Sequence, residues 1–295
     1  MPGRNGHERA ATQAPTATPV VRADRTAELA EEAAVVKNRQ RALLLCVLPP
    51  GVLGVVVAVV LLVLGQVLVA LGALVLVTAI GAAWLWRTAP DTVLGALGAK
   101  PSNEDDRPRL HNLVDGLCAT MGLDRPAIAV VESEVPNALA LGRDPKSATL
   151  VVTSGLDRFL TLVELEGVLA HELVHIKRND TARSAVAVLV AVPWTVVRGI
   201  PAGVDAVHGL VGRGREFSAD QRAALVVRYP SGIGAALGAM LEGSARITDW
   251  PPVPGRIAAL TRWLWVDPMA GPTGGESPVG NLDDTSVRAA ALTLD

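Results

Sequence analysis

The sequence contains few aromatic residues and few cysteines. Only nine of its 295 residues are aromatic, six Trp, two Phe and one Tyr, so its apolar half consists mostly of Ala, Val and Leu. Its two cysteines, Cys46 and Cys118, are too few for a disulfide framework, and their spacing is not that of a metal site. We therefore expect both to be buried in the protein as small apolar side chains. The net charge of −2 gives no basic field that would indicate nucleic-acid binding.

Charge is absent from 45 consecutive residues, 42–86. A membrane-crossing helix needs about 20 apolar residues, so this run excludes an entirely soluble protein and predicts a transmembrane helical hairpin. We place its spans at 42–64 and 67–86, with the turn at Gly65 and Gln66. A long buried hairpin in a soluble protein is the alternative, and it is disfavoured because core helices seldom lack a polar face for so long.

Positive charges flank this hairpin on both sides, whereas its turn carries none. They are Arg22, Arg25, Lys37, Arg39 and Arg41 before it, and Arg87, Lys100 and Arg107 after it. The positive-inside rule then places both flanks in the cytoplasm. We therefore expect a multi-pass protein of the cell inner (plasma) membrane. A cleaved signal peptide is disfavoured, because about 40 polar residues precede the apolar run.

The remaining chain divides by composition into three further segments. We expect a partly disordered cytoplasmic segment at 1–41, helical from residue 24, a globular domain at 95–265 and a flexible tail at 266–295. Periodicity and turn residues predict the elements of the domain: helices at 109–121, 161–178, 213–228 and 256–265, and strands at 127–131, 138–141 and 149–153.

The helix at 161–178 carries a motif with a metal-ligand spacing, His171-Glu-Leu-Val-His175. Histidines at positions i and i+4 lie on one helical face, so both rings can reach one zinc ion at about 2.0–2.1 Å. Glu172 lies beside that face, where it can accept a proton from the attacking water. Two histidines that pair on a helix surface are the alternative, but an apolar run precedes the motif and indicates burial.

A catalytic zinc ion usually has a third protein ligand, which must come from outside this helix. His208 and His111 are candidates, but Glu216 is better, because Asp220 follows it at i+4 and can face the same point. A carboxylate one turn after the ligand could accept the second N–H of a bound histidine and fix its tautomer.

Together these motifs resemble the HtpX-type membrane metalloproteases, which share one zinc peptidase family with the CAAX prenyl proteases. The resemblance rests on the zinc motif, Arg-Glu216-Phe-Ser-Ala-Asp220, Pro136–Ala140, Val152–Leu156, and Pro251-Pro252 followed by Arg256-Ile257 and Leu260. The sequence departs from the family pattern at Trp250, where the family has His, and at Leu139, where Phe is usual.

The resemblance implies an α+β, mainly helical, zincin-like (gluzincin) peptidase domain at 95–265, with a small β-sheet, attached to the transmembrane hairpin. It implies one Zn²⁺ per chain, ligands His171, His175 and Glu216, and Glu172 as the catalytic base. Asp220 then orients a ligand, and Asn137 and Ala138 lie on a substrate-binding edge strand. Arg222 and Arg256 are candidate oxyanion donors.

The implied function is zinc-dependent endoproteolysis at the cytoplasmic membrane face, for the quality control of membrane proteins. The partners are polypeptide substrates, membrane proteins above all, and the lipid bilayer, with no nucleic acid. The alternative is a non-catalytic, zinc-stabilised membrane interaction module, and an intramembrane protease ranks last, because Lys177, Arg178 and Asp180 follow the motif.

The hydrophobic segment 184–212 constrains the topology. Glu216 can meet His171 only if the chain between them crosses the bilayer zero or two times. Two full spans would use nearly all of that chain, and its charged residues would make them costly. We therefore expect a re-entrant or interfacial hairpin.

Overall fold

The computed structural model describes residues 19–229, 231–245, 254–268 and 283–293, with side chains from residue 30 onward. The segment 1–18, Trp250 and the Pro251-Pro252 element lie outside the described residues.

The described chain is mainly helical, with one small sheet. Its α-helices are α1 (Pro19–Val63), α2 (Val67–Ala96), α3 (Pro108–Met121), α4 (Leu156–Phe159), α5 (Leu162–Lys177), α6 (Thr181–Val211), α7 (Arg215–Ala223), α8 (Ser231–Ala245), α9 (Arg256–Leu260) and α10 (Thr285–Thr293). There are also two 3₁₀ helices, η1 (Pro145–Ser147) and η2 (Arg262–Leu264). The strands of the described chain are β1 (Lys100–Pro101), β2 (Ala127–Val131), β3 (Ala138–Leu141) and β4 (Thr149–Thr153).

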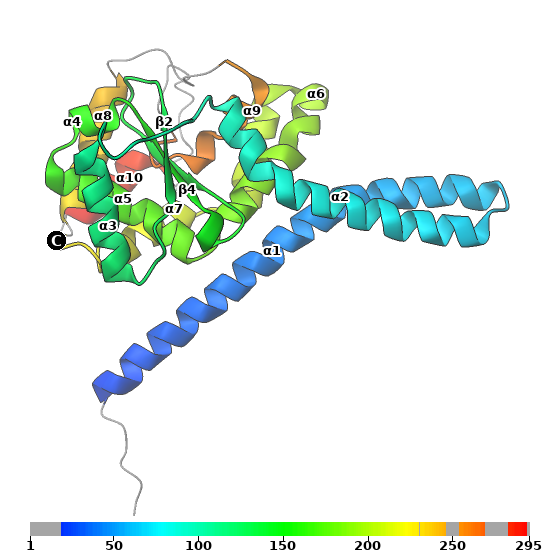
Figure 1. Ribbon diagram of the computed structural model, residues 1–295, viewed down its shortest axis with the longest axis horizontal. Coiled ribbons are helices and arrows are strands. Elements are labelled where there is room, and N and C mark those ends of the chain that lie inside the picture. Colours follow the sequence, from blue (N-terminus) through cyan, green and yellow to red (C-terminus); the bar gives the residue numbers. More distant parts are fainter. Residues whose placement is uncertain (1–18, 230, 246–253, 269–282, 294–295) are drawn as a thin grey trace, which may run out of the picture.

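Helices α1 and α2 form a long hairpin that projects from the rest of the molecule (Figure 1). The chain reverses at Gly65, whose φ of +77° favours glycine. The two helices approach closely where Gly81 faces Pro50, because a Cβ on Gly81 would lie 2.5 Å from the Pro50 Cβ. Both helices are long and apolar enough to cross a membrane, and α6 is the third such helix in the described chain.

The four strands form a mixed sheet in the order β1-β2-β4-β3. Strands β2 and β4 are parallel, whereas β1 pairs antiparallel with β2 and β3 antiparallel with β4. Alternate side chains enter two different cores. One core contains Ile128, Val130 and residues of α3, α5 and α8. The other contains Ala129, Val131 and residues of α2, α6 and α9, so the sheet separates α5 from α6.

Helix α6 is itself a hairpin of two helical arms, 181–198 and 200–211. Its backbone breaks at Gly199, where φ is +83° and ψ is 169°. The arms then lie side by side: a Cβ on Gly203 would lie 2.5 Å from the Thr195 side chain, and Arg183 donates to the carbonyl of Val211. Both ends of α6 are therefore on one side. The second arm, at about 1.5 Å per residue, is too short to span a bilayer core of about 30 Å.

The structure agrees with most of the predicted elements and corrects three. The predicted helix at 256–265 is divided into α9, which ends at Leu260, and η2. The three central strands have the predicted bounds, and α1 continues from the polar flank into the apolar run. Helix α7 ends at Ala223, well short of the predicted residue 228. The expectation of a flexible tail is wrong for 283–293, which contains α10. This helix packs against α8 and buries the Arg288 side chain completely.

Candidate metal centre

The histidine motif lies on α5, which begins with the predicted capping box. Thr161 Oγ1 accepts from the Glu164 N–H, and the Glu164 carboxylate accepts from the Thr161 N–H at 2.7 Å. This box satisfies N–H groups that the first turn leaves without helical partners. Helix α5 packs against β3 and α7, and the two histidines are no more than 2% exposed.

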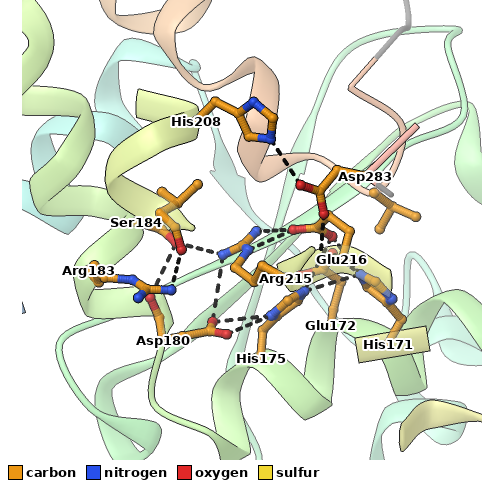
Figure 2. Close-up of polar contacts among 12 residues, drawn as sticks. His171, Glu172, His175, Asp180, Arg183, Ser184, His208, Arg215, Glu216 and Asp283 are labelled. Carbon is orange, nitrogen blue, oxygen red and sulfur yellow. Dashed lines mark hydrogen bonds and ion pairs between the residues drawn. The ribbon is translucent and has the colours of Figure 1, made fainter. Parts of the chain in front are cut away.

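Helices α5 and α7 bring three ligand atoms to one point (Figure 2). The Nε2 atoms of His171 and His175 lie 3.2 Å apart, and Glu216 Oε2 lies 2.9 Å from the first and 3.4 Å from the second. Two ligands at about 2.0–2.1 Å from a tetrahedral zinc ion are roughly 3.3 Å apart. The spacing of the three atoms therefore fits zinc, and the buried donor set of two imidazoles and a carboxylate suits it chemically.

The second nitrogen of His171 is fixed by a buried ion pair. Its Nδ1 donates to Asp220 Oδ1 at 2.7 Å, because a carboxylate can only accept. Arg288 of α10 donates to both oxygens of Asp220, at 2.6 and 2.9 Å. This pair holds His171 with Nε2 directed at the ligand point, as a histidine that binds a metal requires.

His175 is held in the same way by Asp180 and Arg215 (Figure 2). Its Nδ1 donates to Asp180 Oδ2 at 3.0 Å, and the guanidinium of Arg215 lies 3.6 Å from Asp180 Oδ1. Arg215 also donates to Glu216 Oε1 at 2.7 Å, which leaves Oε2 free for the ligand point.

The start of α7 is held by Asp283, from the chain just before α10. Its carboxylate accepts from the backbone N–H groups of Gly214 at 2.7 Å and of Glu216 at 3.2 Å, and also from His208 at 2.9 Å. A carboxylate at a helix N-terminus is favourable, because the N–H groups there have no helical partners. His208 therefore supports α7 from outside the cluster, stacked on Trp263, and is not the third ligand.

Among the described residues, Glu172 is the acidic side chain of the site that has no hydrogen-bond partner. It is 1% exposed, and neither of its carboxylate oxygens has a hydrogen-bond partner in the described part of the chain. Burial raises its pKa above the usual range, an effect that outweighs the nearby histidines. A buried carboxylate without partners is costly, so this position indicates a ligand or water beside the three convergent atoms.

The charges at the site favour protonated histidines when no metal is bound. Burial lowers the pKa of His175, but the carboxylates of Asp180 and Glu216 outweigh it and raise the pKa to about 9. The pKa of His171 is likewise raised, because Asp220 outweighs burial. The pKa of Glu216 is well below its usual value: burial raises it, but Arg215 and the histidines prevail.

Asn137 and Ala138 are bonded within the chain. Asn137 is fully buried and donates its amide to the carbonyl of Asp267 at 2.8 Å, while the Val266 N–H donates to the carbonyl of Ala138 at 2.9 Å. The beginning of β3 is thus already paired along its outer edge. A substrate role for these two residues stays a prediction.

The two candidate oxyanion donors do not contact the cluster. Arg222 forms an ion pair with Glu31 of α1, and Arg256 is exposed at the start of α9. His111 is also remote from the ligand point, because its ring bonds to Ser102 and Arg125.

Sequence reasoning missed four residues that support the centre: Asp180, Arg215, Asp283 and Arg288. A local signal existed for the first two. Asp180 follows His175 by one helical turn and a residue, and Arg215 precedes Glu216 directly. No local signal marked Asp283 or Arg288, which lie in the segment expected to be flexible.

Comparison with known proteins identifies the relatives of this chain. The model of peptidase family M48 matches residues 104–264, more than half of the chain. A protease HtpX homolog of Tropheryma whipplei (strain Twist) is 37% identical over 179 residues, which cover 50% of this chain and 61% of that protein. A protease HtpX homolog 1 of Streptomyces coelicolor is 37% identical over 183 residues, 52% of this chain and 60% of that protein.

A third relative is covered more fully. The protease HtpX homolog of Salinibacter ruber is 30% identical over 204 residues, which cover 62% of this chain and 72% of that protein. The comparison with solved structures gave no significant match. The family model spans strands β2, β3 and β4, α5 and α7, and therefore includes both parts of the histidine and glutamate cluster. The chain belongs to peptidase family M48, among its HtpX-type members.

Proposed function

We propose that this protein is a membrane-anchored zinc endopeptidase with a zincin-like domain, in which His171, His175 and Glu216 hold one Zn²⁺. The observation that carries the proposal is the buried Glu172 carboxylate, which has no hydrogen-bond partner in the described chain and lies beside three convergent ligand atoms. A purely structural zinc site has no use for such a base.

Each residue of the site has a distinct role in the proposed reaction. Zinc, when bound, supplies Lewis-acid chemistry that polarises the scissile carbonyl and makes water more acidic. Glu172 accepts the proton of the attacking water and then donates it to the leaving amine. Its raised pKa suits this exchange, because a base that also acts as an acid works best near the operating pH. Asp220 and Asp180 keep both histidines oriented.

The membrane location is part of the proposal. The α1–α2 hairpin would cross the inner (plasma) membrane twice, with the peptidase domain in the cytoplasm, because basic residues flank both ends and its turn is uncharged. The α6 hairpin would lie in the membrane interface or enter it only partly. This reading is supported by its two ends, which meet at Arg183 and Val211, and by its short second arm.

We propose polypeptides as substrates, and membrane proteins in need of quality control as the physiological class. An extended substrate could pair with the edge strand β3, since backbone pairing does not depend on sequence. At Asn137 and Ala138 such pairing would require Val266 and Asp267 to move away, because they occupy that edge.

The test compares Glu172→Gln with wild type, purified in detergent. We expect the variant to keep one zinc ion per chain and to lose at least about 100-fold in cleavage of a casein-like substrate, since general acid–base catalysis contributes about 10²–10⁴-fold. The matched control is Glu166→Gln, which changes a half-exposed glutamate on the same helix and should cleave normally. Full activity of Glu172→Gln would refute the mechanism.

A second candidate is a zinc-stabilised interaction module without turnover. It is favoured by the occupied edge of β3, which leaves the expected substrate position bonded within the chain. It predicts one zinc ion per chain in the wild type, together with no cleavage of casein-like or membrane-protein substrates.

A further inference from the structure

A strongly basic pocket of about 250 Å³ lies between α1 and the peptidase domain, beside the metal centre. It is lined by six basic side chains and one acidic one: Lys37 and Arg41 of α1, Arg178 and Arg183 near the junction of α5 and α6, Arg213 and Arg215 at the start of α7, and Asp180. The ratio of six cations to one carboxylate is unusual for a cavity in a protein whose net charge is −2.

Most of these cations are not neutralised within the described chain. Asp180 and Arg215 are committed to His175 and Glu216. Arg178 and Arg183 donate to uncharged groups, the Ser218 hydroxyl and the Val211 carbonyl. The charge of Asp180 also acts on Arg183, but it is shared with His175 and Arg215.

The other basic side chains of the pocket also lack acidic partners among the described residues. Lys37, Arg41 and Arg213 form no ion pair there. Arg183 is only 5% exposed, and its Nε, like that of Arg178, is buried without a hydrogen-bond partner in that part of the chain. Buried guanidinium N–H groups without a hydrogen-bond partner are costly, so the pocket is suited to an anion.

The pocket lies where α1 enters its apolar run. Arg41 is the last charged residue before residues 42–86. Helix α1 is held in place there by Asn38, whose amide donates to the Arg178 carbonyl at 3.0 Å, and by the ion pair of Glu31 with Arg222. The rim of the pocket is therefore level with the expected membrane surface.

One face of α1 joins this charged rim to an apolar surface. Lys37, Arg41, Leu44 and Leu48 recur at helical spacing, and Leu44 and Leu48 are 61% and 60% exposed. A ligand with an anionic head group and apolar chains could contact both the basic rim and the adjacent leucines, whereas a free anion would contact only the basic rim. Basic pockets on the cytoplasmic side of transmembrane helices bind anionic lipid headgroups in this way.

We propose that this pocket binds the phosphate group of an anionic phospholipid, whose acyl chains lie along Leu44 and Leu48 of α1. The phosphate accepts hydrogen bonds from guanidinium N–H groups that have no partner in the described chain, foremost the Nε groups of Arg183 and Arg178. Arg41 and Arg213 attract it at the open rim. The lipid is thereby one side chain, Arg215, away from the metal ligand Glu216.

The experiment measures lipid binding by the delipidated full-length protein in detergent, using native mass spectrometry. The probes are phosphatidylglycerol and phosphatidylcholine with identical acyl chains, the second of which has no net charge. We expect selective retention of phosphatidylglycerol. A basic residue near the membrane surface contributes about fivefold in affinity, so Arg41→Ala and Arg213→Ala should each lose about fivefold, and the double variant roughly 25-fold.

The matched control is Arg39→Ala, on the same helix two residues from Arg41 and outside the pocket. It should change binding by less than about twofold. Arg39, Arg41 and Arg213 are exposed, so all variants should fold with an unchanged Tm. Equal loss in the control, or equal retention of both lipids, would overturn the proposal.

Inorganic phosphate serves as the competitor that separates a lipid from a free anion. We expect it to displace phosphatidylglycerol only in large excess, because it lacks the chains that contact α1. Displacement at equal concentration would assign the pocket to a free anion and overturn the lipid assignment. Since the readout is lipid binding, the result does not depend on whether the protein cleaves peptides.

Discussion

The two histidines of the metal centre are held by the same chemistry but from different distances along the chain. His175 donates to Asp180, only five residues away, at the beginning of the next helix. His171 donates to Asp220, 49 residues away, which in turn pairs with Arg288 of α10, a further 68 residues along. We call these the local arm and the remote arm.

The comparison shows that the two arms depend differently on the rest of the fold. In the local arm, the pKa of Asp180 is lowered by His175, Arg215 and Arg183 together, against the effect of burial. In the remote arm, Asp220 relies on Arg288 and His171, and Arg288 reaches it only if α10 docks. Helix α10 is therefore part of the candidate metal centre, although none of the three proposed ligands lies on it.

The largest effect should come from Arg288→Ala, which removes the cation of the remote arm. The loss leaves the buried Asp220 carboxylate without its arginine and should cost about 3–5 kcal/mol of unfolding free energy. Denaturant unfolding of the zinc-loaded protein measures this cost.

Arg215→Ala should lower the free energy of unfolding by less, because Arg183 remains near Asp180. Arg256→Ala changes an exposed site and should be nearly neutral. If Arg215→Ala lowered the free energy of unfolding more than Arg288→Ala, the local arm would depend on its arginine more than the remote arm does, contrary to our expectation.

Removal of either carboxylate charge should weaken the metal site next. Asp220→Asn and Asp180→Asn each take away the acceptor that fixes a histidine, so zinc affinity should fall by about 10- to 100-fold. Competition with a chromogenic chelator measures the affinity. Asp124→Asn, at an exposed aspartate, is the control. Unchanged affinity in both site variants would show that the arms do not orient the ligands.

Zinc binding should depend steeply on pH. The pKa of His175 in the metal-free protein is about 9, so its ring is protonated at neutral pH and must release that proton to bind zinc. Apparent affinity should therefore rise about tenfold per pH unit from pH 7 to pH 9 for each proton released. Asp180→Asn should flatten this rise more than Asp220→Asn, because Asp180 is the main group that raises the pKa of His175. A flat profile in the wild type would contradict the charge assignment.

The same shift makes the stability of the metal-free protein depend on pH with the opposite sign. A raised folded-state pKa contributes stability that is complete below the unfolded value of about 6.5 and is lost as the pH rises through about 9. Unfolding of the zinc-free protein should therefore become easier across this window, while the zinc-loaded protein should not show the loss.

The smallest effect should come from an exposed ion pair, which serves as the reference for both arms. Arg158 and Glu134 lie 2.9 Å apart, but their side chains are 65% and 61% exposed. Arg158→Ala should cost no more than about 1 kcal/mol, since water already solvates both charges. A cost comparable with that of Arg288→Ala would mean that burial does not distinguish the arms from ordinary surface pairs.

Much of the fold and of the candidate ligand cluster could be predicted from the sequence, because the relevant patterns are local. The capping box of Thr161 and Glu164 marked the start of α5, and alternation of apolar residues marked the three central strands with their bounds. The C-terminal tail was wrongly predicted to be flexible, because the contacts that order it are made with residues far away in the sequence. Its composition of Gly, Pro, Ser and Asp indicates a loose chain, but Asp283 and Arg288 each find a partner on α7.

The sequence by itself determined the candidate ligand pair on α5, the proposed base between the two histidines, and a charge-free run long enough to cross a membrane twice. These features depend on helical periodicity and on segment length, which neighbouring residues specify. Only the tertiary structure decided that Arg288 supports His171, that the outer edge of β3 is occupied, and that six cations gather beside α1. Such arrangements arise when elements far apart in the chain dock and bury charge together, and no local pattern encodes which elements will meet.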